Sequence, residues 1–232
     1  MVETASPPAG RSGRFIVLEG GDGAGRSTQV RLLLPWLEAR GWASAHAGLG
    51  RSALTAKAFR AHKRTREAGA NTLALLYAAD LHDQAAGLVA SGLAAGFAVV
   101  ADRWAPAAEA RCRVRGVPAD WMRAILPAEP VPDLILHLRT PPAERLQRQV
   151  RKRGRPDFLE AGADLGFVPD PLRGFVRYQA LLDREYTRLA AEWGPLWLDV
   201  DGAACPGDIQ AALRRAVGGL LGIAPLEVAD HV

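Results

Sequence analysis

The chain of 232 residues predicts an α/β fold, with a mostly parallel sheet of five strands and helices on both faces. Two observations predict this fold. Short apolar runs alternate with longer helical stretches, which is typical of repeated strand–helix units. Hydrophobic residues make up 49% of the chain and charged residues 23%, which suits one domain with a sizeable core. No repeat of 20–50 residues is present, so one domain is the simplest account.

The individual elements follow from apolar runs and from glycine and proline punctuation. Strands are predicted at residues 14–20, 42–47, 97–103, 132–139 and 195–202. Helices are predicted at residues 27–41, 53–69, 71–92, 105–126 with a break near 116–118, 142–154, 170–194 and 206–222. The folded domain therefore spans residues 14–222. Residues 1–13, rich in Pro, Gly, Ser and Ala, and residues 223–232 are predicted to be tails.

The first strand runs into a glycine-rich segment, GGDGAGRS, at residues 20–27. It fits the phosphate-binding Walker A pattern G-x-x-x-x-G-K-[ST] at every fixed position except Arg26, which replaces the lysine. Glycines let the backbone N–H groups turn inward toward phosphate oxygens, and the following helix adds its positive N-terminus. A ligand-free glycine turn is the alternative. The candidate nucleotide-binding residues are Gly20, Gly21, Asp22, Gly23, Ala24, Gly25, Arg26, Ser27 and Thr28.

Arg26 keeps the positive charge of the missing lysine, but its guanidinium is longer, planar and forked. It can hold two phosphate oxygens at once, yet it need not reach the same point in the transition state. Loss of one aligned charged contact typically costs about 2–4 kcal/mol in the barrier. The loop is thus predicted to bind a nucleotide, and its catalytic strength stays open.

Four stretches, FIVLEGGDGAGRSTQ, LLYAADLHDQ, VVADRW and PDLILHLRTPPAERLQRQVRKRG, together resemble the thymidylate kinase family of nucleoside monophosphate kinases. The resemblance covers most of residues 14–222 and identifies a divergent branch, with Arg26 at the lysine position. It implies a P-loop kinase-type three-layer sandwich with a basic lid. It also implies ATP and Mg²⁺ as cofactors and phosphorylation of a nucleoside monophosphate, with dTMP to dTDP as the first expectation.

The resemblance implies roles for single residues. Asp22 would accept a hydrogen bond from the acceptor's sugar, Tyr77 would stack on its base, and Arg103 would grip its phosphate. Asp102 ends a buried strand, where its carboxylate would hold Mg²⁺ through water, together with the Ser27 hydroxyl. The alternatives are a loop-shaping turn for Asp22, a core aromatic for Tyr77 and a buried ion pair for Asp102 and Arg103.

A basic run, RLQRQVRKRGRPD, falls where the family has its mobile lid, here about residues 148–166. Lid arginines can neutralise charge on the transferred phosphoryl group after closure. Arg151, Arg153 and Arg155 are therefore candidate catalytic residues, together with Arg26, Asp102 and Arg103. A solvated charged face is the alternative for each arginine of the lid.

Three departures from the family pattern lie on the acceptor side. Leu81 stands where the family usually has an arginine that reads the thymine carbonyl. Ala108 and Arg111 stand where polar and aromatic groups face the sugar and base, which makes Arg111 a candidate substrate residue. AGLGRS, at residues 47–52, replaces an acidic-proline-glycine turn. A kinase for another nucleotide, nucleoside or small phosphorylated acceptor, and a non-catalytic nucleotide-binding protein, are therefore kept as alternative functions.

The remaining expectations concern location and partners. No secretory signal and no apolar run of about 20 residues is seen, so a cytoplasmic protein without membrane contact is expected. The net charge of only +4, with the basic residues clustered in one segment, does not indicate a nucleic-acid partner. The resemblance implies a homodimer, and small-molecule nucleotides are the expected ligands.

Overall fold

The computed structural model describes residues 12–65, 68–167 and 169–224. The predicted tails at 1–13 and 223–232 lie almost entirely outside these residues. Gly13 already belongs to the fold, since its N–H donates to the Leu93 carbonyl at 3.2 Å. Among the described residues, no helix combines the length and the apolar character needed to cross a bilayer.

Five parallel strands form one sheet in the order β2-β3-β1-β4-β5. The strands are β1 (Arg14–Glu19), β2 (Ser44–Gly48), β3 (Ala98–Asp102), β4 (Leu134–Arg139) and β5 (Trp197–Asp201). All five predicted strands are confirmed, and the sheet is wholly parallel among the described residues. β1 lies at the centre of the sheet, between β3 and β4, with helices over both of its faces. Every residue from Phe15 to Glu19 is therefore buried.

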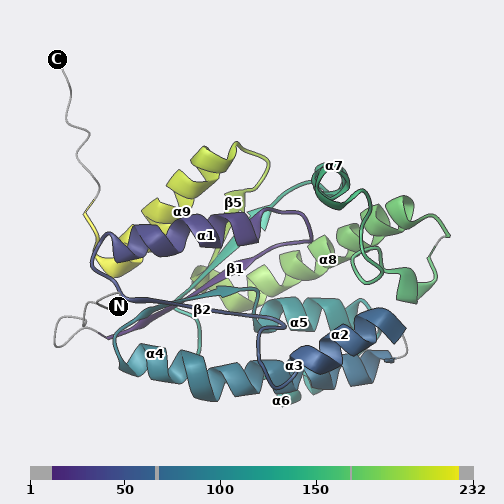
Figure 1. The fold of residues 1–232 in the computed structure, drawn as a ribbon, viewed down its shortest axis with the longest axis horizontal. Helices are drawn as coiled ribbons and strands as arrows, with labels where there is room; N and C mark the ends of the chain where they lie inside the picture. The colour runs from purple at the N-terminus through teal and green to yellow at the C-terminus, as the bar shows by residue number, and fades with distance from the viewer. Residues whose placement is uncertain (1–11, 66–67, 168, 225–232) are drawn as a thin grey trace.

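Helices cover both faces of the sheet, as Figure 1 shows. One face carries α1 (Arg26–Glu38) and α9 (Pro206–Leu221). The other face carries α3 (Ala70–Gln84), α4 (Ala90–Ala94), α5 (Ala105–Arg113), α6 (Ala119–Ile125) and α8 (Pro171–Trp193). α2 (Ala56–Thr65) follows β2, and α7 (Pro142–Arg153) follows β4. The predicted three-layer sandwich is confirmed.

The two layers of core follow from the alternation of side chains along β1. Phe15 and Val17 pack with α3 and α5 side chains, whereas Ile16 and Leu18 pack with α1 and α9. One detail of the helices was not visible in the sequence pattern. A π-helical segment, η1 (Ala85–Val89), joins α3 to α4, so the stretch predicted as one helix changes its winding midway. The predicted break near residues 116–118 is present, between α5 and α6.

The carboxyl ends of β1, β2 and β3 meet at one edge of the sheet, because parallel strands share a direction. The register places Leu18 beside Asp102 and Gly48 beside Asp102. The loop after β1, the loop after β2 and the turn after β3 therefore converge, as ligand sites of open α/β sheets do.

Candidate active site

The loop between β1 and α1 has the geometry that a phosphate cradle needs. Gly25 sits at the N-cap of α1 with φ 99° and ψ 1°, a left-handed conformation that favours glycine. Gly21 has no room for a side chain, since a Cβ there would lie 1.3 Å from a guanidinium nitrogen of Arg145. The first helical N–H groups of α1 have no side-chain cap, so they are left for an anion.

Arg26 folds into the loop instead of projecting away from it. Its Nε donates to Asp102 Oδ1 at 2.8 Å, and its Nη1 donates to the carbonyls of Gly20 and Gly21. Burial and the nearby Arg103 lower the pKa of Arg26, yet a guanidinium keeps its charge at neutral pH. The arginine thus braces the phosphate loop against β3 and still lines the cavity beside it.

Ser27 and Asp102 form a pair of hard oxygen donors at the start of α1. The Ser27 Oγ donates to Asp102 Oδ2 at 2.6 Å. Burial alone would raise the pKa of Asp102, but Arg26 and Arg103 lower it to about 2, so the carboxylate is ionised at neutral pH. Mg²⁺ prefers one or two such protein oxygens, with phosphate and water completing its octahedron. The donor set therefore fits Mg²⁺. No cluster of three or more metal-ligating side chains occurs among the described residues.

Asp22 is the centre of a buried charge cluster. Arg103 donates to its Oδ1, Arg111 donates to both of its oxygens at 2.9 and 2.7 Å, and Gln179 donates to Oδ2 at 2.9 Å. Burial opposes the charge of Asp22, but the two arginines hold its pKa well below the usual value. A turn-shaping role, the alternative for Asp22, does not account for these contacts by itself, because the Asp22 carboxylate connects α5, α8 and the phosphate loop.

The turn after β3 is held by Glu19, the last residue of β1. Arg103 has φ 69°, a left-handed conformation that costs a non-glycine residue on the order of 1 kcal/mol. The Glu19 carboxylate accepts the N–H groups of Trp104 and Ala107 at 3.0 and 3.2 Å, and so caps α5 from a neighbouring strand. Its second oxygen accepts the Tyr186 hydroxyl at 3.2 Å. Full burial raises the pKa of Glu19 to about 7.

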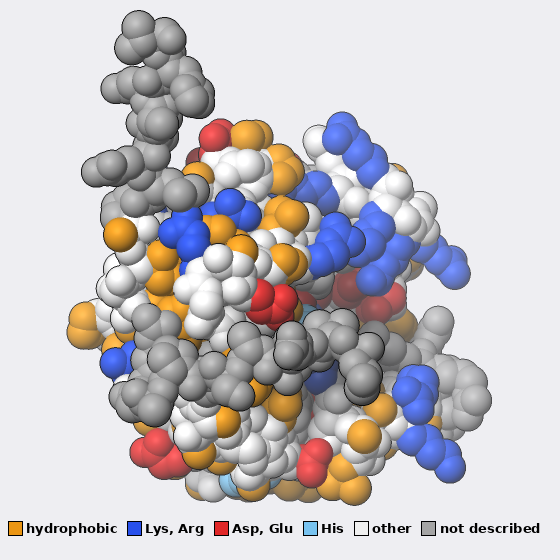
Figure 2. Space-filling model, turned by 60° about the vertical axis from the view of Figure 1, so that its left-hand side comes forward, with side chains coloured by type: hydrophobic (Ala, Val, Ile, Leu, Met, Phe, Trp, Pro, Cys, Tyr) orange, Lys and Arg blue, Asp and Glu red, His pale blue; other side chains and the backbone are white. Residues whose placement is uncertain are grey.

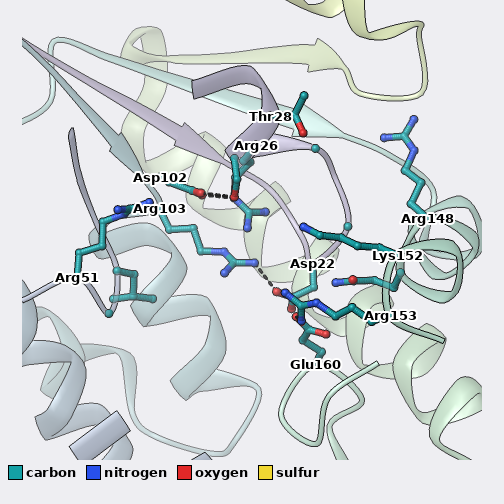
Figure 3. Close-up of a pocket in the computed structure, with 16 residues that line it drawn as sticks. Asp22, Arg26, Thr28, Arg51, Asp102, Arg103, Arg148, Lys152, Arg153 and Glu160 are labelled. Carbon is teal, nitrogen blue, oxygen red and sulfur yellow. Dashed lines mark hydrogen bonds and ion pairs between the residues drawn. The ribbon is translucent and has the colours of Figure 1, made fainter. Parts of the chain in front are cut away.

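These elements surround one cavity of about 580 Å³. Figure 2 shows basic side chains gathered on this face of the molecule beside acidic ones. The cavity wall holds six basic side chains against three acidic ones, which suits a polyanion. The basic residues are Arg26, Arg51, Arg103, Arg148, Lys152 and Arg153, and the acidic residues are Asp22, Asp102 and Glu160. In Figure 3, Arg51 and Arg103 lie on one side of the cavity, and the side chains from α7 lie on the other.

A second pocket, of about 180 Å³, adjoins this cavity and shares with it Asp22, Leu49, Gly50, Arg103 and Glu160. The pocket is bounded by the rings of Phe59 and Tyr77, whose centroids lie 5.5 Å apart, and by Arg111. Burial raises the pKa of Tyr77 to about 12, so the phenol stays neutral. Tyr77 is thus both buried and on a pocket wall, where a flat ring could stack.

The three arginines predicted for the lid occupy different places. Arg153 lines the cavity and forms an ion pair with Glu160 at 3.1 Å. Arg151 lines a hollow beside α7 that Arg148 also borders, and Arg155 lines another that Arg153 also borders. Arg148 and Lys152, from the same helix, reach the cavity instead.

The departures on the acceptor side also have definite places. Leu81, on α3, is fully buried in the core and lines neither cavity, and Ala108 is buried in the same way. Arg111 is buried, and its guanidinium donates to both carboxylate oxygens of Asp22. Of these three residues, Arg111 is therefore the one that lines the second pocket.

Sequence reasoning missed several residues of the site, among them Gln179 and Arg51. Gln179 of α8 receives the N–H of Asp22 at 2.9 Å and donates to the Glu160 carbonyl at 3.3 Å, which ties the phosphate loop to the lid. It lies 157 residues from Asp22, and a single glutamine in a helix carries no local signal. Arg51 lies in the segment already noted as unusual, and its position after β2 could have indicated it.

Comparisons with known proteins agree with this geometry. The family model described as thymidylate kinase matches residues 18–163. The chain is 29% identical to "Probable thymidylate kinase 2" of Saccharolobus solfataricus, over 89% of this chain and 96% of that protein. It is 34% identical to "Thymidylate kinase" of Parasynechococcus marenigrum, over 79% of this chain and 92% of that protein. A "Probable thymidylate kinase" of Pyrococcus horikoshii is 33% identical, over 61% and 72%.

Proposed function

Because the chain belongs to the thymidylate kinase family, we propose that it transfers the γ-phosphoryl group of ATP to dTMP, giving dTDP and ADP. The observation that carries the proposal is the joined pair of cavities. A phosphate loop and three cationic side chains from α7 face one end of the larger cavity, and Arg103 stands at the opening into the smaller pocket.

ATP binds with its phosphates on residues 20–28. The backbone N–H groups of the loop and the N-terminus of α1 meet the phosphate oxygens. Arg26 supplies the charge that a lysine has in most such loops, from a position fixed by Asp102. Arg148, Lys152 and Arg153 meet the outer phosphates when the lid closes.

Ser27 and Asp102 would hold Mg²⁺, Ser27 directly and Asp102 through water. The ion would neutralise charge on the phosphate chain of ATP. The Ser27 hydroxyl could keep its hydrogen bond to Asp102 in that arrangement, because donating the hydrogen leaves the lone pairs of its oxygen for the ion.

dTMP occupies the smaller pocket. Arg103 and Arg51 hold its phosphate at the boundary of the two cavities, and Tyr77 and Phe59 face its base. Asp22 and Arg111 meet the sugar as one hydrogen-bonded unit, because Arg111 already donates to Asp22.

The chemistry needs positioning and charge more than it needs a base. An oxygen of the acceptor phosphate, already anionic, attacks the γ-phosphorus, and the bond from that phosphorus to the oxygen of ADP breaks. Charge spreads over the moving group, where the cationic side chains of the lid and the loop stabilise it. No covalent enzyme intermediate is required.

An assay of ADP release with ATP·Mg²⁺ across nucleoside monophosphates and deoxynucleosides tests the proposal. We expect turnover with dTMP at a kcat/KM at least about tenfold above that for any other acceptor. Turnover with a different acceptor would keep the kinase and replace its substrate. ATP binding without turnover on any acceptor would contradict the proposal. A cytoplasmic location, a homodimer and the lack of nucleic-acid binding stay predictions.

A further inference from the structure

The loop that follows β2 brings Arg51 to the wall of the phosphate cavity. We call residues 49–55 the Arg51 loop. The sequence of this loop, LGRSALT, contains no proline and includes Gly50, so its covalent structure does little to restrict its backbone. Arg51 itself is exposed, and Figure 3 shows it on the same side of the cavity as Arg103. Some other part of the protein must therefore hold the loop in place.

Asp80 of α3 holds it. This side chain is fully buried, and all of its described hydrogen-bond partners are donors. Its Oδ2 accepts the N–H of Gly50 at 2.6 Å, and its Oδ1 accepts the N–H of Ser52 at 2.9 Å and the Thr55 hydroxyl at 2.7 Å. A carboxylate suits this position, because both of its oxygens accept. The N–H groups on either side of Arg51 are thus fixed to one side chain.

Gln84, one helical turn along α3, makes the arrangement specific for a carboxylate. Its amide oxygen accepts the N–H of Gly48 at 3.0 Å, and its amide nitrogen donates to the Gly48 carbonyl at 2.9 Å. That pairing fixes which end of the amide faces Asp80, and the nitrogen donates to Asp80 Oδ2 at 3.0 Å. Gln84 cannot turn over to suit a donor at Asp80 without losing both bonds to Gly48.

We propose that Asp80 is a positioning residue for acceptor binding, which acts by holding Arg51 against the acceptor's phosphate. The inference rests on the proposed function, in which Arg51 and Arg103 take that phosphate. Asp80 touches neither cavity, so its effect passes through the Arg51 loop. It fixes the loop backbone on both sides of Arg51, in addition to the local bonds from the Arg51 N–H to the Gly48 carbonyl and from the Leu54 N–H to Ser52 Oγ.

Asp80→Asn is the sharpest variant, because it keeps the size of the side chain. An amide nitrogen would face two donors at either oxygen position. These are the Gly50 N–H and the Gln84 amide nitrogen at Oδ2, and the Ser52 N–H and the Thr55 hydroxyl at Oδ1. Asp83→Asn is the matched control. Asp83 lies on the same helix, is exposed, and accepts only the Ser52 hydroxyl from the loop among the described residues.

Affinity for dTMP is measured by calorimetry, and KM and kcat by the kinase assay, on the full chain. We expect Asp80→Asn to weaken dTMP binding at least about tenfold, with the KM for ATP changed less than about twofold. Asp83→Asn should stay within about twofold of the wild type. In an Arg51→Ala background, adding Asp80→Asn should produce little further loss, because the residue through which it acts is gone.

Hydrogen exchange reports on the loop independently of any acceptor. Asp80→Asn should speed exchange in residues 49–55 and leave the phosphate loop at 20–28 unchanged. The inference is overturned if Asp80→Asn binds dTMP as Asp83→Asn does, or if its loss is undiminished in the Arg51→Ala background. Failure of the proposed function would look different: the wild type would not bind dTMP, while Asp80→Asn would still loosen the loop.

Discussion

Arg26 braces the phosphate loop and also places a positive charge beside the cavity. Its guanidinium fork reaches Asp102 and two loop carbonyls at the same time, which a lysine ammonium on a shorter stem does less well. The charge stays next to the phosphate cavity, because the side chain lines it. The replacement of the usual lysine thus keeps a positive charge beside the cavity, and the loop gains a tie to β3.

Substitution at Arg26 separates these two tasks. We expect Arg26→Met to lower kcat about 10²–10³-fold, because the transferred phosphoryl group loses one aligned charge. Arg26→Lys keeps the charge and should stay within about tenfold of the wild type. Steady-state kinetics with ATP and dTMP measures both. Equal kcat values for Arg26→Met and the wild type would show that the residue only braces the loop.

Glu19 gives the protein a pH dependence that can be measured. Burial raises its pKa from 4.5 to about 7 in the folded state. Between these two values the folded protein binds more protons than the unfolded chain, so the free energy of unfolding falls as pH rises. A shift of this size corresponds to about 3 kcal/mol in the free energy of unfolding. This contribution is fully present below pH 4.5 and is lost as the pH rises to about 7.

Glu19→Gln removes this titration while keeping an oxygen for the N–H groups of Trp104 and Ala107. We expect the variant to gain stability relative to the wild type as pH rises from 5 to 8. Urea unfolding at intervals of one pH unit measures the difference. Parallel stability curves for the two proteins would show that Glu19 does not titrate in this range.

At the scale of elements, α7 presents different side chains to different surroundings. Arg148 and Lys152, four residues apart on α7, reach the cavity together. Arg151 lines a neighbouring hollow that Arg148 also borders, and Arg155 lies beyond the last helical residue, Arg153. Three arginines that look equivalent in the basic run are thus placed differently with respect to the site.

The lid arginines can be compared directly. Arg153→Ala should lower kcat at least about tenfold, because it removes a cation from the cavity and an ion pair with Glu160. Arg151→Ala should change kcat less than about threefold, since Arg151 lines a neighbouring hollow and not the cavity itself. Single-turnover rates with saturating ATP and dTMP check both. Similar losses in the two variants would mean that closure brings Arg151 to the phosphates.

The sequence predicts elements well where a local pattern exists. The parallel strands are short runs with apolar residues, bounded by glycine or proline, and all five were predicted in this way. The phosphate loop has a local pattern too. The π-helical segment at Ala85–Val89 has none, because it changes the winding of a helix without a break in its apolar pattern.

At the scale of the whole molecule, the site is built from contacts that no local pattern contains. Glu19 meets Trp104 across 85 residues, and Gln179 meets Asp22 across 157. Such contacts depend on the order of strands in the sheet. Helical periodicity along residues 142–153 could have indicated Arg148 and Lys152, whereas the capping of α5 by Glu19 could not have been predicted from either segment alone.

The same topology explains how one fold serves two ligands. The loops after β1, β2 and β3 and the lid after α7 meet at one edge of the sheet, and each contributes at least one charged group to the cavity. Under the proposed function, the phosphate loop belongs to the donor end. Arg103 and Arg51 would then belong to the acceptor end, about which the family pattern in this chain is least informative.

Measuring dTDP formed from ATP and dTMP by the wild type and by Arg103→Ala, side by side, tests this account most directly. The account predicts one dTDP for each ATP consumed by the wild type. It also predicts a KM for dTMP at least about tenfold higher in Arg103→Ala, with the KM for ATP nearly unchanged. ATP consumption without dTDP, or an Arg103→Ala enzyme with the wild-type KM for dTMP, would contradict it.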